Sequence, residues 1–333
     1  MSLSRRALHF VALTLFIAAA CSDSKPSTPA AQTSSGPSSG PSSDVTAGSN
    51  ASTQPNGASN ASPCGDTTGA AAASSATHVM WIWMENHQAG DVLGNADAPF
   101  ENQLAHECGS STTYASVGSP SLPNYIGATA GDTFGIHDDS GPNAHRLTVD
   151  NVFRQARTAG LDSKSYEDGM DRPCSLASSG TYAVKHNPAA YFFGADDHTA
   201  CSHDDVVLGT ASSGALLDDL RLDALPEFSL ITPDLCHDTH DCSVADGDAF
   251  LAQLVPVILA SGTYRSGNLV VFIVWDEPTP MPLLVIAPSV KPGTAPTTTF
   301  NHYSLLRTTE EILGLPLLAK AQSATSMRAA FGV

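Results

Sequence analysis

Two short apolar runs constrain the fold of this chain more than any other feature. His78–Met84 (HVMWIWM) and Leu269–Trp275 (LVVFIVW) consist almost entirely of branched aliphatic and aromatic residues. Runs of this length and composition are typical of strands buried on both faces, as in parallel sheets. Residues 228–231 and 283–287 predict two further strands, and residues 161–166 predict a weaker one. The sequence therefore predicts a mainly parallel central sheet.

Helical patterns lie between the predicted strands. Four segments carry them: residues 99–108, 149–160, 250–258 and 305–313. Gly109 and Gly314 stand at expected helix ends, and Thr148 stands at an expected helix start. Pro256 should kink or break the third helix. Because strands alternate with helices, the fold class is predicted to be α/β, as a three-layer α/β/α sandwich.

The N-terminus is typical of an export signal. Arg5 and Arg6 precede a short apolar stretch, residues 10–20, and Cys21 follows. Residues 18–21 resemble a bacterial lipobox, in which Cys21 is acylated, but they also fit an ordinary cleavage site. Removal of Cys21 leaves six of the seven cysteines, an even number suited to three disulfides, and this parity favours lipidation. We therefore expect an exported cell-envelope lipoprotein, with a secreted soluble protein as the alternative.

The chain is predicted to divide into three parts. Residues 1–20 form the signal peptide. Residues 21–63 hold the lipidated cysteine and a Ser/Pro/Gly-rich segment, which has too few apolar residues to fold and is expected to be a disordered tether. Residues 64–333 remain for one folded domain, and the expected membrane link is the lipid on Cys21 rather than a spanning helix.

The charge balance excludes one class of partner. The chain has 33 acidic residues against 15 basic ones, for a net charge of −18. Nucleic-acid binding depends on clustered Lys and Arg, so a nucleic-acid partner is not expected. The same acidity disfavours electrostatic docking on an anionic membrane surface.

Acidic and amide side chains follow the two strongest predicted strands. Glu85 and Asn86 come directly after the first strand, and Asp276 and Glu277 come directly after the second. In open α/β sheets, ligands bind beyond the carboxyl ends of the strands. Oxygen ligands delivered to one edge predict a divalent metal site, although the sequence does not identify the metal. The alternative is that polar residues simply end these strands.

Ser121 lies in the segment SPSLPNY, residues 119–125. Pro123 suits the first turn of a helix, so Ser121 falls at or just before a helix N-terminus. Unpaired backbone N–H groups and the helix dipole would stabilise both a serine alkoxide and a phosphate there. A simple capping role for the serine is the alternative.

A dense cluster of ionisable residues follows the predicted strand at 228–231. Residues 232–242 (TPDLCHDTHDC) combine histidines and aspartates in a loop that a Cys236–Cys242 bridge would constrain. Such a loop suits metal ligation or proton transfer, and a structural disulfide loop is the alternative. His186 and His302 are weaker candidates, with capping roles as alternatives. Six cysteines allow 15 pairings. Adjacency suggests Cys236–Cys242 and Cys174–Cys201, which leaves Cys64–Cys108 by elimination.

Taken together and in order, six segments resemble one family. They are residues 84–86, 119–125, 185–188, 232–242, 274–277 and 302–316. Their motifs resemble the phosphoesterase family of bacterial and fungal acid phosphatases and phosphatidylcholine-type phospholipases C, within the alkaline-phosphatase superfamily. The resemblance implies an alkaline-phosphatase-like fold and a bound divalent metal ion.

The resemblance also implies roles for individual residues. Ser121 would be the nucleophile. The metal ligands would be Glu85, Asn86, Ser121, Asp276 and Glu277. Three histidines would lie around the phosphate or leaving group: His237, His240 and His302. The substrate-binding residues would be Asn124, His186 and Asp234.

The predicted function is that of an exported acid phosphatase. It would cleave phosphate monoesters, phosphoinositides among them, through a metal-activated Ser121 and a phosphoserine intermediate. Its partner would be a small phosphorylated substrate or a phospholipid head group. Two alternatives remain open: a phosphodiesterase or phospholipase C that uses the same site, and a lipoprotein that binds a solute without turnover.

Overall fold

The computed structural model describes residues 62–65 and 74–333. The predicted signal peptide, Cys21 and the predicted tether as far as residue 61 lie outside the described residues. Ser62 donates a hydrogen bond to the carbonyl of Glu107, and the carbonyl of Pro63 accepts one from the Tyr264 hydroxyl. None of the helices in the described part has the length and apolarity needed to cross a bilayer.

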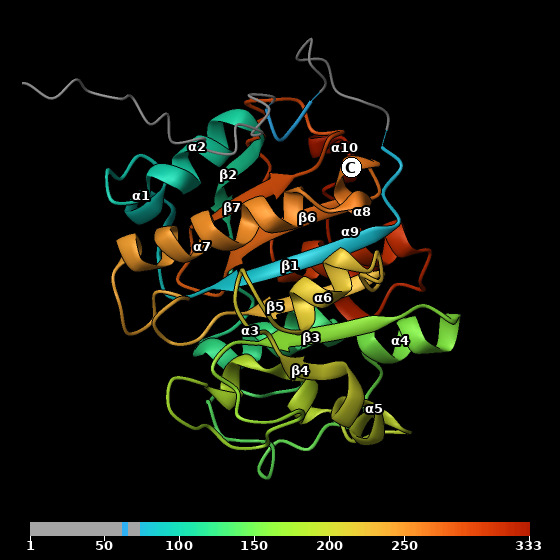
Figure 1. The fold of residues 1–333 in the computed structure, drawn as a ribbon. Helices are drawn as coiled ribbons and strands as arrows, with labels where there is room; N and C mark the ends of the chain where they lie inside the picture. Colours follow the sequence, from blue (N-terminus) through green and yellow to red (C-terminus); the bar gives the residue numbers. More distant parts are fainter. Residues whose placement is uncertain (1–61, 66–73) are drawn as a thin grey trace, which may run out of the picture. The chain divides into compact units, whose positions relative to one another are not determined.

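Seven strands form a single sheet in the order β2-β7-β6-β1-β5-β3-β4 (Figure 1). The strands are β1 (His78–Met84), β2 (Gly109–Tyr114), β3 (Ser163–Glu167), β4 (Asp205–Val207), β5 (Phe228–Thr232), β6 (Leu269–Trp275) and β7 (Met281–Ile286). The pairings of β1, β3, β4, β5 and β6 with one another are parallel, and β7 pairs antiparallel with both of its neighbours. The sheet is therefore mainly parallel, as predicted.

The two apolar runs occupy the middle of this sheet. All residues of β6 are buried, as are residues 79–84 of β1, because helices cover both faces. The two strands pair in register, with Met84 opposite Trp275 at their carboxyl ends. The residues that follow them therefore emerge side by side at one edge of the sheet.

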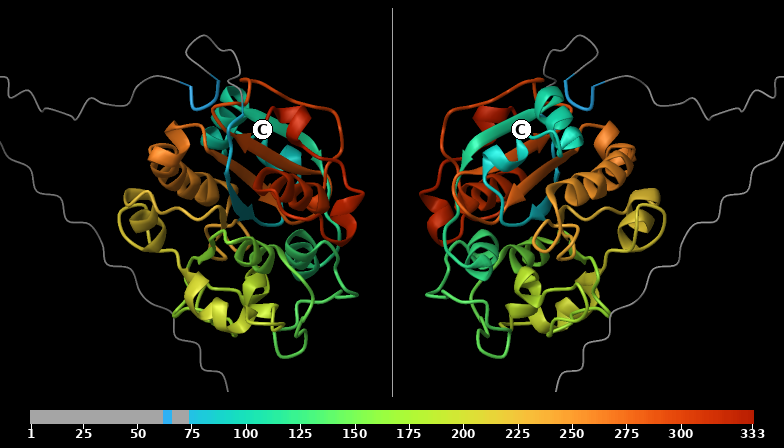
Figure 2. Two further views of the ribbon diagram at one scale, coloured as in Figure 1. Left: turned by 90° about the vertical axis from the view of Figure 1, so that its right-hand side faces the viewer. Right: turned by 90° about the vertical axis from the view of Figure 1, so that its left-hand side faces the viewer.

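Helices lie on both faces of the sheet, with α7 and α6 on one side and α3 and α9 on the other (Figure 2). The helices are α1 (Ala89–Val92), α2 (Pro99–Glu107), α3 (Ser121–Ala130), α4 (Val152–Ala159), α5 (Asp197–Asp204), α6 (Ala215–Arg221), α7 (Val244–Leu259), α8 (Gly262–Arg265), α9 (His302–Leu313) and α10 (Arg328–Phe331). Three 3-10 turns are η1 (Val184–His186), η2 (Pro188–Tyr191) and η3 (Ala319–Gln322). This arrangement confirms the predicted three-layer α/β/α sandwich.

Several helix boundaries differ from the prediction: α7 begins at Val244 rather than at residue 250, and α9 begins at His302 rather than at residue 305. Helix α2 ends as expected, but Gly109 begins strand β2 and pairs with Val285 of β7. A Cβ at this position would lie 2.7 Å from the ring of Phe331, so any other residue would force that ring to shift. Helix α4 begins after Asn151 rather than Thr148, because the Asn151 side chain accepts the N–H of Arg154 and caps the helix.

Of the predicted kink or break at Pro256, the break is wrong. Helix α7 runs through this residue and ends three positions later at Leu259. Because the proline lies in the last turn, only one intrahelical hydrogen bond is lost to its missing N–H. The buried residues Leu254, Val255 and Ile258 flank it and hold this turn against the sheet.

The described residues contain three disulfides: the two pairings that adjacency suggested and the third that was left by elimination. They are Cys64–Cys108, Cys174–Cys201 and Cys236–Cys242. Disulfides persist in oxidising compartments, so they indicate a location outside the cytoplasm. The third bridge closes the loop between β5 and α7, which carries several of the candidate site residues.

Candidate active site

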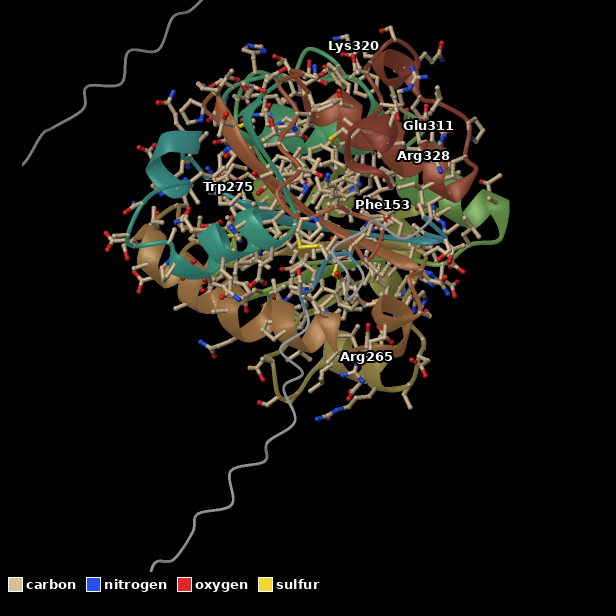
Figure 3. The ribbon with its side chains drawn as sticks, turned by 90° about the horizontal axis from the view of Figure 1, so that it is seen from above. Phe153, Arg265, Trp275, Glu311, Lys320 and Arg328 are labelled. Carbon is tan, nitrogen blue, oxygen red and sulfur yellow. A yellow bond between two sulfur atoms is a disulfide. The ribbon has the colours of Figure 1, made fainter. Side chains whose placement is uncertain are left out.

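Three buried carboxylates gather at the carboxyl edge of the sheet, at the left of Figure 1 where β1 ends. Glu85 follows β1, and Asp276 follows β6 directly after Trp275, which is labelled in Figure 3. Asp238 comes from the loop after β5, and its backbone carbonyl accepts the N–H of Glu85 at 2.8 Å. All three carboxylates have no exposed surface.

Glu85 is the centre of this cluster. Its Oε2 accepts a hydrogen bond from the Ser121 hydroxyl at 3.1 Å, and its Oε1 accepts one from the Tyr125 hydroxyl at 2.6 Å. Ser121 is the first residue of α3 and Tyr125 lies one turn later, so both face the same side of the helix. The helix that the sequence predicted thus presents the candidate nucleophile to the end of β1.

Asn86 links the ends of the two central strands. Its backbone N–H donates to Asp276 Oδ1 at 3.0 Å, and its side-chain amide donates to Glu85 Oε2 at 3.3 Å. The residue has a φ of 59°, in the left-handed region that asparagine tolerates better than most residues. The turn therefore aims an exposed amide at the same place as the buried carboxylates.

The N-terminus of α3 offers fewer free donors than the sequence suggested. The N–H of Leu122 donates to Asp139 Oδ1 at 3.0 Å. Asp139 in turn accepts a hydrogen bond from the Lys185 ammonium through Oδ2 at 3.2 Å. The expectation that an unpaired N–H at this position receives the phosphate is therefore wrong for Leu122.

Two histidines complete the cluster. The buried His186 places Nε2 3.3 Å from Glu85 Oε1 and Nδ1 3.2 Å from Asp238 Oδ2. Its ring stacks on Tyr125, with the ring centroids 5.2 Å apart. His240 is partly exposed and has a ring nitrogen within 4.8 Å of ligand atoms of Glu85 and His186.

The electrostatics of the cluster favour a bound cation. Burial raises the pKa of Glu85 well above its usual range, and the nearby carboxylates of Asp276 and Asp238 raise it further. Burial also raises the pKa values of Asp238 and Asp276. It lowers the pKa of His186 well below its usual range, so the imidazole does not neutralise these acids.

The donor set fits a divalent metal. The Oδ2 atoms of Asp238 and Asp276 and the Nε2 atom of His186 are buried and make no hydrogen bond among the described residues, because the 3.2 and 3.3 Å contacts of His186 do not have hydrogen-bond geometry. Unpartnered buried carboxylate oxygens are costly unless a cation or a proton satisfies them. Carboxylate, hydroxyl and amide oxygens are ligands that divalent cations such as Mg²⁺ and Mn²⁺ accept.

His302 lies next to the cluster, but both of its ring nitrogens already have partners. Its Nε2 donates to the backbone carbonyl of Asp276 at 2.8 Å, and its Nδ1 lies 3.1 Å from the Tyr114 hydroxyl. Its ring also stacks on Trp83. Burial lowers the pKa of His302 to about 4. The neutral ring therefore holds the Asp276 backbone in place.

His237 and Asp234 belong to a second cluster. His237 Nδ1 lies 2.6 Å from Asp168 Oδ2 and 3.4 Å from Asp234 Oδ1, and its ring stacks on Phe250. This histidine lines a cavity of about 370 Å³. In the part of the chain that is described, no side-chain hydrogen bond of this cluster reaches Ser121 or Glu85.

Asn124 and Glu277 occupy other positions. The Asn124 side chain is buried and accepts the N–H groups of Val117 and Gly118, so it shapes the loop before Ser121. Glu277 is partly exposed beside Asp276, and none of the hydrogen bonds of residues 74–333 involves its side chain.

Four residues of the cluster were not selected from the sequence: Asp238, Lys185, Tyr125 and Asp139. The first three lie inside the motif segments 232–242, 185–188 and 119–125, and Tyr125 follows Ser121 at helical spacing. Asp139 lies in a loop without a recognisable pattern, so no sequence signal could have found it.

Comparison with known proteins places this site in context. The profile described as the Phosphoesterase family matches residues 54–279. A protein of Mycobacterium tuberculosis named phosphatidylinositol-3-phosphatase is 29% identical over 253 residues, which cover 74% of this chain and 80% of that protein. A phosphate-repressible acid phosphatase of Penicillium chrysogenum is 24% identical over 256 residues, 72% of this chain and 59% of the relative. The chain thus spans less than two thirds of this fungal relative.

Solved structures share the fold at low sequence identity. An alkaline phosphatase superfamily protein from Vibrio parahaemolyticus aligns with a TM-score of 0.51 and 12% identity, over 80% of this chain and 76% of that one. A lipoteichoic acid synthase from Listeria monocytogenes aligns with a TM-score of 0.52 and 10% identity, over 78% and 79% of the two chains. The alkaline-phosphatase-like fold that the motifs implied is thereby confirmed.

Proposed function

Because this chain belongs to the Phosphoesterase family and is a phosphoric ester hydrolase of the acid phosphatase kind, we propose that it cleaves phosphate monoesters with Ser121 as the nucleophile. The observation that carries the proposal is the 3.1 Å hydrogen bond from the Ser121 hydroxyl to Glu85 Oε2. It places the hydroxyl at an edge where Glu85, Asp238 and Asp276 are all buried.

The reaction has two displacements. The Ser121 Oγ attacks phosphorus as its proton passes to a nearby base, and the bond from phosphorus to the leaving oxygen breaks with its electron pair on that oxygen. The leaving oxygen takes a proton and departs as an alcohol, which leaves a phosphoserine. Water then attacks the phosphoserine, inorganic phosphate departs, and the serine hydroxyl is restored.

The residues around Ser121 are proposed to have separate roles in this reaction. Glu85 accepts the serine hydrogen bond, and Tyr125 and Asn86 hold Glu85 in place. His240 is the histidine suited to meet the leaving oxygen, because it is partly exposed within the cluster. His302 is fully buried, and His237 lies in the second cluster.

The metal site is also part of the proposal. The proposed ligands of a divalent cation are Glu85, Asn86, Ser121, Asp238 and Asp276. When bound, the cation would stabilise negative charge on the phosphoryl oxygens and on the serine oxygen. Glu277 stays a prediction as a further ligand, because its side chain is partly exposed.

We propose a phosphoinositide monophosphate as the substrate class. The relative named phosphatidylinositol-3-phosphatase supports this choice. An exported protein with a signal peptide at residues 1–20, a lipid on Cys21 and a tether over residues 21–63 would hold the domain near such a lipid. Detergent partitioning and the intact mass of the mature protein test the anchor.

A substrate panel tests the activity. Wild-type protein is assayed with p-nitrophenyl phosphate, phosphatidylinositol 3-phosphate, bis(p-nitrophenyl) phosphate and phosphatidylcholine, with and without a chelator. We expect faster hydrolysis of the monoesters, and loss of activity with the chelator that added metal reverses. Ser121→Ala should lower turnover by about a thousandfold or more. The exposed Ser119→Ala is the matched control and should retain activity.

Each other outcome has a defined meaning. Faster hydrolysis of either diester would identify a phosphodiesterase or phospholipase C at the same site. A folded protein that binds phosphate without turnover would identify a solute-binding protein. Undiminished turnover by Ser121→Ala would exclude this serine as the nucleophile.

A further inference from the structure

We propose that Lys185 binds the transferred phosphoryl group and makes the enzyme selective for monoester dianions over diesters. This inference rests on the proposed function and deepens it by assigning the substrate charge that the site recognises. Lys185 lies in the turn η1, directly before the buried His186.

The ammonium group is close to the reaction site. Its Nζ lies 3.2 Å from His240 Nε2, and His240 has a ring nitrogen within 4.8 Å of a carboxylate oxygen of Glu85. Glu85 accepts the hydrogen bond of the Ser121 hydroxyl. Two side chains, Glu85 and His240, therefore connect the Ser121 hydroxyl to the lysine.

Asp139 ties this lysine to the nucleophile helix. One oxygen of Asp139 accepts the Lys185 ammonium at 3.2 Å, and the other accepts the N–H of Leu122, the residue after Ser121. The Lys185 side chain retains 20% of its exposure, so it is held in position but remains open to a ligand. The arrangement orients one positive charge beside the first turn of α3.

Other basic residues are engaged elsewhere. Within residues 74–333, the ion pairs of other Lys and Arg residues include Arg154 and Arg157 with Asp197, Lys164 with Asp219, Arg307 with Glu311 and Lys320 with Asp132. In that same range, Lys185 is the basic residue whose side-chain hydrogen bonds reach the cluster around Glu85. The backbone N–H of Leu122 already donates to Asp139 and is not available to a phosphate oxygen. The Lys185 ammonium can donate to such an oxygen, and it also supplies a positive charge.

The charge of the substrate decides what this lysine selects. A phosphate monoester has a second pKa near 6 and carries nearly two negative charges at pH 7 to 8. A diester carries one negative charge fewer and presents one fewer free oxygen. A charge-assisted hydrogen bond to that additional charged oxygen is made only with the monoester.

The test compares Lys185→Met and Lys185→Arg with a matched control, Lys164→Met, which removes another partly buried lysine paired with an aspartate. The metal-loaded proteins are assayed at pH 7.5 with p-nitrophenyl phosphate. Bis(p-nitrophenyl) phosphate is scored by turnover or as a competitive inhibitor. Calorimetry measures the binding of inorganic phosphate, and circular dichroism checks folding.

We expect Lys185→Met to lower kcat/KM for the monoester by about 30-fold, chiefly through KM, because a charged hydrogen bond is lost. Phosphate binding should weaken by about tenfold or more. The constants for the diester should change by less than about threefold. Lys185→Arg should recover most of the loss, and Lys164→Met should match the wild type.

Equal losses for monoester and diester would overturn the inference, because Lys185 would then support the site without selecting charge. Unchanged monoester kinetics in Lys185→Met would overturn it as well. A wild-type protein inactive on both esters would refute the proposed function instead. In that case calorimetry decides the inference: weaker phosphate binding by Lys185→Met supports it, and unchanged binding overturns it.

Discussion

Glu101 should make the stability of the fold depend on pH. This residue of α2 is fully buried, and neither of its carboxylate oxygens accepts a hydrogen bond from the described residues. Asp248 on α7 lies beside it and accepts the backbone N–H of Glu101 at 2.8 Å. Burial, and then the charge of Asp248, raise the pKa of Glu101 from 4.5 to about 8.

The magnitude follows from the two pKa values. In the fold the carboxyl holds its proton up to about pH 8, whereas in the unfolded chain it loses the proton near pH 4.5. The free energy of unfolding that depends on the protonation of Glu101 is therefore largest below pH 4.5 and falls as the pH rises to about 8. Each pH unit of that interval costs about 1.4 kcal/mol, so the total approaches about 5 kcal/mol.

Glu101→Gln removes this titration while keeping the shape of the side chain. The free energy of unfolding, measured by urea titration, should fall less steeply with pH in the variant than in the wild type. Between pH 5.5 and 7 we expect the two slopes to differ by about 1.4 kcal/mol per pH unit. The variant should be more stable than the wild type at pH 8. Glu107→Gln, on the same helix but partly exposed, is the control. Parallel pH profiles for Glu101→Gln and the wild type would refute the reasoning.

Two further predictions concern the site and the disulfides. Tyr125→Phe removes the 2.6 Å hydrogen bond to Glu85. The affinity of the metal-free enzyme for an activating cation should therefore fall by about tenfold or more. Titrations with Mg²⁺, Mn²⁺ and Zn²⁺ that match the wild type would contradict this prediction. Replacement of Cys236 and Cys242 by alanine should lower the free energy of unfolding by about 2 kcal/mol and strongly reduce kcat, since this loop carries Asp238. Replacement of Cys64 and Cys108, which close a longer loop, should lower it by about 4 kcal/mol and leave kcat near that of the wild type. Thermal unfolding and steady-state kinetics measure both effects, and the opposite order would count against them.

The central strands could be predicted because their residues must be apolar on both faces. Strand β2 (GSSTTY) could not, since its polar sequence gains strand structure only by pairing with β7. Similarly, the cap of α4 depends on a contact that the spacing of apolar residues does not reveal: the Asn151 side chain meets the N–H of Arg154.

Some residues of the candidate site could likewise be predicted from the sequence, and others could not. Glu85 and Asp276 could be predicted because they follow adjacent parallel strands, which fixes where they emerge. Asp238 was one of several aspartates in a single loop, and only the folded loop distinguishes it from its neighbours. Lys185 and Asp139 meet across 46 residues of sequence, and no local pattern encodes that contact.

The most direct test of the account is to identify the residue that carries the phosphoryl group during turnover. Metal-loaded protein is mixed with p-nitrophenyl phosphate, quenched in acid, digested and analysed by peptide mass spectrometry. We expect one added phosphoryl group on Ser121, absent from Ser121→Ala. Turnover with Ser121 unmodified and the phosphoryl group on another residue would contradict it.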